Sequence, residues 1–225
     1  MKKPLLIVFI ILVIDQIVKI WIKTHMTLGD EIFLAGNWAI IHFTENNGMA
    51  FGMQFAGEYG KLFLSIFRVV AVLLLAWYIY HLTRKKENFG LIFCFSLILA
   101  GAIGNIIDSA FYGMIFSEST YYSAARLFPP EGGYSSFLHG KVVDMFYFPI
   151  IEGIYPEWFP FKGGQQFLFF RPVFNVADSA ITTGVLSLII FQRSFFKEKH
   201  HHEEARTSDG DQQIPQAEEV TQKDL

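Results

Sequence analysis

The sequence predicts an α-helical integral membrane protein with four transmembrane helices, a small extracytoplasmic β-sheet and an interfacial aromatic-rich insertion. The chain is 52% hydrophobic and only 17% charged, with a mean hydropathy of +0.34. An ordinary soluble domain has about 25% charged residues. Aromatic residues make up 17% of the chain, and they are typical of the belts at membrane surfaces. Four apolar stretches approach the roughly 20 residues needed to cross a bilayer.

The four expected spans cover residues 4–22, 62–82, 91–112 and 173–191. Basic residues lie before the first span (2 and 3), between the second and third (84–86) and after the fourth (193, 197 and 199). The positive-inside rule therefore predicts that both termini are cytoplasmic. The first span resembles a secretory signal, but it is long and lacks a small-residue cleavage site, so we expect it to be retained.

Two long loops, about 24–61 and 113–172, then face outward. Apolar runs at 32–34 and 38–43 are punctuated by glycines and predict a small sheet. Residues 154–170 are rich in aromatics and suit the membrane interface better than water. We therefore expect residues 1–196 to form one four-span domain. Residues 197–225 are polar and acidic, and we expect a disordered cytoplasmic tail.

Charged side chains inside the spans need an explanation, because each costs about 2.5–3.5 kcal/mol on insertion scales. Asp15 and Lys19 are four residues apart, so they share one helix face and can neutralise each other. Asn105 and Asp108 form a polar stripe on the third span, which could be interhelical contact or function.

A similar stripe on the fourth span contains Asn175 and Asp178. Asp178 is expected about five residues inside the span and has no basic partner there, which favours function over helix contact. Asp144 lies between apolar residues in the second outer loop, on the same membrane side. Two carboxylates in a poorly hydrated site share a proton, which is the chemistry of an aspartic hydrolase.

Other chemistries have little support in the sequence. No basic excess indicates nucleic-acid binding, and Cys94 lies within an apolar run. Persuasive Ser–His, Cys–His and zinc-ligand spacings are absent. Two alternatives remain open: a proton-coupled transporter or export factor, and a membrane assembly subunit with polar helix contacts.

Five motifs in order resemble those of the bacterial lipoprotein signal peptidases, an intramembrane aspartyl protease family. They are Asp15-Gln16-x-x-Lys19, Asn46-x-Gly48-x-Ala50-Phe51, Gly104-Asn105-x-x-Asp108, Val142-Val143-Asp144 and Phe174-Asn175-x-Ala177-Asp178-Ser179. The resemblance implies that Asp144 and Asp178 are catalytic. It implies supporting or substrate-contacting roles for Asp15, Lys19, Asn46, Gly48, Asn105, Asp108 and Asn175.

The implied substrate is a prolipoprotein whose lipobox cysteine carries diacylglycerol, cut just before that cysteine. The implied enzyme needs neither metal nor cofactor. We expect a monomer in contact with membrane lipids in the bacterial cytoplasmic (inner) membrane, with its site at the outer face. Ser109 stands where the family usually has Arg, and the segments 114–141 and 149–171 are longer than usual. We expect these insertions to form a lid or lip over the site.

Overall fold

Helices of membrane-spanning length dominate the fold. The computed structural model describes residues 2–47, 57–149, 151–169 and 172–191. Helix α1 spans Lys2–His25, α2 spans Gly57–Arg84 and α3 spans Phe89–Ile107. The α3 axis continues through a π-helix, η2 (Asp108–Tyr112), into the short α4 (Gly113–Ile115). Within the described residues, three helical stretches are long and apolar enough to cross a membrane, and a shorter apolar helix covers Val176–Phe191. The predicted membrane class is confirmed.

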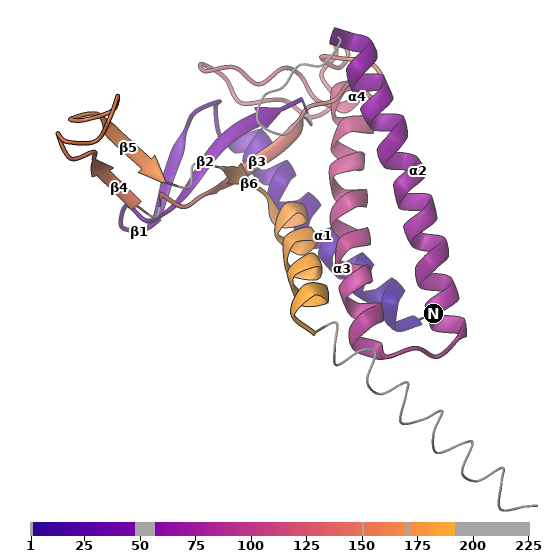
Figure 1. The fold of residues 1–225 in the computed structure, drawn as a ribbon. Coiled ribbons are helices and arrows are strands. Elements are labelled where there is room, and N and C mark those ends of the chain that lie inside the picture. Colours follow the sequence, from indigo (N-terminus) through magenta and orange to yellow (C-terminus); the bar gives the residue numbers. More distant parts are fainter. Residues whose placement is uncertain (1, 48–56, 150, 170–171, 192–225) are drawn as a thin grey trace, which may run out of the picture.

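Small residues let the C-terminal helix, Val176–Phe191, approach α3 closely (Figure 1). A Cβ atom on Gly101 would lie 2.1 Å from the carbonyl oxygen of Ala177. A Cβ on Gly104 would lie 2.7 Å from Oδ2 of Asp15 on α1. A side chain at Gly101 would therefore collide with backbone, and one at Gly104 would displace the Asp15 carboxylate, where three helices meet.

The sheet lies at one end of this bundle, which we call the sheet end (Figure 1). Its antiparallel strands follow the order β1 (Glu31–Ala35), β2 (Ala39–Asn46), β3 (Val142–Tyr147) and β6 (Val173–Phe174). The two strands expected from the first loop are present. The strand β3 comes from the second loop and was not predicted. Residues 173–174, expected within the fourth span, form β6 instead.

The second loop supplies two further features. Strands β4 (Ile151–Ile154) and β5 (Gln166–Phe169) pair only with each other, as a hairpin. The segment 116–141 packs over the helix ends, where Leu28 N donates to Thr120 O at 2.9 Å. Ser65 Oγ on α2 also donates to Leu138 O at 3.3 Å. This segment therefore ties α1 and α2 together at the sheet end.

Candidate active site

Asp178 is positioned by the start of the C-terminal helix. Asn175 caps the helix: its Oδ1 accepts from Asp178 N at 2.8 Å, while Asp178 Oδ2 accepts from Asn175 N at 3.3 Å. This reciprocal pair is a capping box, which defines a helix N-terminus. Asp178 consequently lies in the first helical turn rather than about five residues inside the span. The positive end of the helix dipole there favours a carboxylate.

Asp144 occupies the middle of β3, opposite Thr44 of β2, and is 4% exposed. Its Oδ1 accepts from Asn175 Nδ2 at 2.8 Å, and the side chain also hydrogen-bonds Asn46. Burial and the charge of Asp178 raise the pKa of Asp144 to about 7, while the two amide contacts oppose that rise. Asp144 therefore holds a proton at a pH where an ordinary aspartic acid is ionised.

Two side-chain amides join the carboxyl groups of Asp144 and Asp178. Asn105 Nδ2 donates to Asp178 Oδ1 at 2.8 Å. Asn105 Oδ1 accepts from Asn175 Nδ2 at 3.2 Å, and Asn175 reaches Asp144 with the same nitrogen. The structure therefore brings together residues from β3, α3 and the C-terminal helix that are far apart in sequence.

A fully buried cluster of charged side chains supports the Asp144–Asp178 pair. Lys19 Nζ lies 3.0 Å from Asp15 Oδ2 and 2.8 Å from Asp108 Oδ2, which confirms the predicted Asp15–Lys19 pairing. Asp15 Oδ1 accepts from Ala177 N at 2.9 Å, and Asp108 Oδ2 accepts from Val143 N at 3.3 Å. The two carboxylates thus fix the backbone directly beside Asp178 and Asp144.

Three further residues near the site, Gln16, Tyr112 and Arg68, had no role predicted from the sequence. Gln16 Nε2 donates to Asp108 Oδ1 at 3.0 Å, and its Oε1 accepts from Tyr112 Oη at 3.1 Å. Arg68 on α2 interacts electrostatically with Asp178. Gln16 and Arg68 could have been identified from the sequence as candidate site residues, because each is a polar side chain inside an otherwise apolar span.

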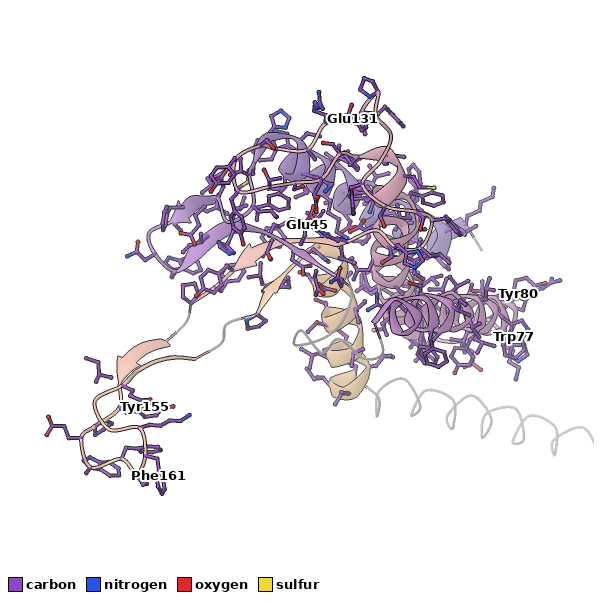
Figure 2. The ribbon with its side chains drawn as sticks, turned by 90° about the horizontal axis from the view of Figure 1, so that it is seen from above. Glu45, Trp77, Tyr80, Glu131, Tyr155 and Phe161 are labelled. Atoms are coloured by element: carbon purple, nitrogen blue, oxygen red, sulfur yellow. The ribbon has the colours of Figure 1, made fainter. Side chains whose placement is uncertain are left out.

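Ser109 is buried, and its Oγ donates to Asn105 O at 3.0 Å, one turn back in the helix. The positive counter-charge for Asp108 comes from Lys19, 2.8 Å away, rather than from a following arginine. Gly48 lies outside the described residues. The hairpin 151–169 projects sideways from the bundle instead of covering the carboxyl pair, because its strands pair with each other rather than with the sheet (Figures 1 and 2).

Comparison with known proteins gives consistent matches over most of the chain. The family model for signal peptidase (SPase) II matches residues 7–194. A lipoprotein signal peptidase of Porphyromonas gingivalis is 52% identical over 185 residues, covering 82% of this chain and 80% of that protein. One of Amoebophilus asiaticus is 38% identical and covers 84% of this chain and 76% of its own length. A solved bacterial membrane enzyme has the same fold, with a TM-score of 0.57, 22% identity and coverage of 97% and 96%.

Proposed function

Because this chain belongs to the signal peptidase II family, which cleaves signal peptides from prolipoproteins, we propose that Asp144 and Asp178 catalyse that cleavage. The observation that carries the proposal is the pair of amides, Asn105 and Asn175, that link the two carboxyl groups. Intramembrane acids could also serve a transporter or helix contacts. Family membership instead makes the protein an aspartic protease.

The surroundings of the two carboxyl groups differ. Asp178 accepts from Asn105 Nδ2 and from a backbone N–H, and it lies at a helix N-terminus. Asp144 is buried in a strand, where its pKa rises to about 7. Asp144 therefore carries the shared proton at rest, and Asp178 is the base.

The reaction follows from this assignment. The Asp178 carboxylate takes a proton from water as the water oxygen bonds to the scissile carbonyl carbon. Asp144 gives its proton to the carbonyl oxygen, which yields a neutral tetrahedral diol. In the collapse, Asp178 returns its proton to the amide nitrogen and Asp144 recovers one from a diol hydroxyl. The carbon–nitrogen bond breaks to release an acid and an amine.

The position of the Asp144–Asp178 pair supports the proposed substrate and membrane location. It lies where the C-terminal helix begins, so a substrate anchored in lipid presents its scissile bond at that depth with little further loss of entropy. The substrate is a prolipoprotein cut before its diacylglyceryl-modified lipobox cysteine. The enzyme acts as a monomer at the outer face of the bacterial inner membrane, with both termini in the cytoplasm.

Cleavage of a diacylated lipobox peptide by full-length protein in vesicles tests the proposal. We expect Asp144→Asn and Asp178→Asn each to lose at least about 10²-fold in kcat, the lower range for loss of a general acid or base. Both variants should insert and melt as cooperatively as the parent. Asp30→Asn, a matched change of an exposed acid on the turn before β1, should cleave normally. Substantial turnover by either dyad variant would refute the assignment.

A further inference from the structure

The turn between β4 and β5 displays a group of aromatic side chains outward. Phe161 is fully exposed (101%), Trp158 is 79% exposed and Phe159 is 38% exposed. The rings contact one another: the centroids of Tyr155 and Phe159 lie 4.8 Å apart, and those of Trp158 and Phe159 lie 6.1 Å apart. Lys162 Nζ lies 5.9 Å from the centroid of the Tyr155 ring. We call residues 155–162 the aromatic tip.

The aromatic tip is an ordered turn rather than a loose loop. Gly164 N donates to Tyr155 O and Gly163 N donates to Phe159 O, at 2.9 and 3.0 Å. A Cβ on Gly163 would lie 2.4 Å from Glu157 O, so the turn closes tightly there. Phe161 has a φ of +66°, which a bulky residue rarely adopts. The backbone is thus held in a strained form that turns an apolar ring outward.

The position of the β4–β5 hairpin relative to the helices indicates which environment surrounds it. In Figure 1 it lies beside the bundle, within the height spanned by α2 and α3, rather than beyond the helix ends. Figure 2, seen from above, shows Tyr155 and Phe161 well clear of the helices. The hairpin also ends close before the C-terminal helix, since β5 stops at Phe169 and that helix begins at Val176.

We propose that the aromatic tip inserts into the bilayer interface beside the bundle and anchors the strands that carry the site. Tryptophan and phenylalanine rings with a lysine at their edge match the boundary between lipid chains and headgroups. Lipid contact covers the exposed rings, and Lys162 reaches the phosphate level. The spans expose rings to lipid in the same way, as Trp77 on α2 does at 64% exposure.

The anchor acts on the site through chain connectivity. The hairpin lies between β3, which carries Asp144, and β6, which leads into Asn175 and Asp178. Along the chain, the hairpin therefore follows the strand that carries Asp144 and precedes the strand that leads to Asp178. A tip fixed in the interface holds these strands at one depth relative to a lipid-anchored substrate.

Tryptophan quenching in vesicles of phosphatidylcholine and phosphatidylglycerol tests this proposal with the full-length chain. Trp158 becomes the single reporter after Trp21→Phe, Trp38→Phe and Trp77→Phe. A variant that keeps only Trp77 is the lipid-exposed control. A tryptophan-free chain with Tyr122→Trp reports on the segment 116–141, where Tyr122 is 95% exposed. Phe161→Trp in the tryptophan-free chain is a second reporter of the tip.

With lipids brominated near the top of their acyl chains and no substrate present, we expect Trp158 to lose most of its emission, as Trp77 does. Aqueous iodide should quench the Tyr122→Trp reporter strongly and Trp158 weakly. The proposal is overturned if Trp158 and the Phe161→Trp reporter are both quenched by iodide and not by brominated lipid. Quenching by brominated lipid chains only on an added diacylated substrate would also overturn it, because the tip would then bind substrate.

Discussion

At the scale of single residues, Asn175 connects more of the site than any one carboxyl group does. It caps the C-terminal helix through Asp178 N, donates to Asp144 Oδ1 and donates to Asn105 Oδ1. The stripe of Asn175 and Asp178 was evident from sequence spacing. The amide links to Asp144 were not, because they join segments more than 30 residues apart.

Two substitutions of Asn175 separate its capping role from its role in the carboxyl pair. Serine preserves a helix cap but lacks the amide donor, whereas alanine loses both. We expect both Asn175→Ser and Asn175→Ala to lower kcat at least about tenfold, which corresponds to a loss of about 1.4 kcal/mol of transition-state stabilisation. Only the alanine variant should also lose the cap, at about 1 kcal/mol.

The measurements are kcat on lipidated peptide and the thermal midpoint of the inserted protein. Full activity in Asn175→Ser would contradict a role for the amide in the site. Asp30→Asn again serves as the unaffected control.

At the scale of elements, α1 carries a buried polar stripe with a period of four residues. It consists of Asp15, Lys19 and Lys23, all fully buried. Lys23 belongs to a second cluster at the sheet end, where its Nζ pairs with Glu45 Oε1 and donates to Ser119 Oγ. Ser119 Oγ also donates to Glu45 Oε1 at 2.8 Å. This cluster locks α1 to β2 and to the segment 116–141.

Breaking the Lys23–Glu45 pair should destabilise the sheet end. Glu45→Gln leaves a buried ammonium without its counter-charge, which costs about 3–5 kcal/mol. The double variant Lys23→Met/Glu45→Leu removes both charges and should recover most of that loss. Glu118→Gln makes the same change at an exposed acid, 3.3 Å from Lys141, and should cost at most about 1 kcal/mol.

Thermal melting of the inserted protein measures all three variants. If Glu45→Gln melts like Glu118→Gln, the pair does not hold these elements together. If the double variant is no more stable than Glu45→Gln, the loss does not come from the unpaired charge.

The helices were predictable from sequence, whereas half of the sheet was not. A span is a local property, since length and hydropathy identify it without reference to the rest of the chain. The strand β3 pairs with β2 from the first loop and with β6 at the start of the expected fourth span. The apolar runs of β3 and β6 could equally belong to a helix or an interface. Asp144 was identified from the sequence as an acid between apolar residues and by motif resemblance, but its strand became visible only in the structure.

At the scale of the whole molecule, the fold gathers the described residues of the candidate site toward the sheet end. The basic residues 84–86 follow the opposite end of α2. The positive-inside rule therefore predicts that the sheet end faces away from the cytoplasm. Orientation depends on charges at the span ends, so the sequence could predict it before the site was assembled.

Labelling with a membrane-impermeant maleimide tests the orientation. We expect Tyr122→Cys to react in intact spheroplasts, because it is 95% exposed at the sheet end. Lys3→Cys and Lys85→Cys should react only after the membrane is permeabilised. Cys94 is buried in α3 and provides a low native background. Reaction of the two lysine-site variants in intact spheroplasts would reverse the proposed topology.

The proposed catalytic chemistry depends on the proton that Asp144 holds. Its pKa of about 7 lies above that of an unfolded aspartic acid, so the folded protein binds the extra proton below neutrality and loses it as the pH rises through about 7. The most direct test is infrared titration of the protonated carboxylic acid band in full-length protein in vesicles. We predict a band that disappears with a midpoint near pH 7 and is missing from Asp144→Asn. A band that persists unchanged in Asp144→Asn, or no such band in the parent below neutral pH, would show that the pair does not share its proton in this way.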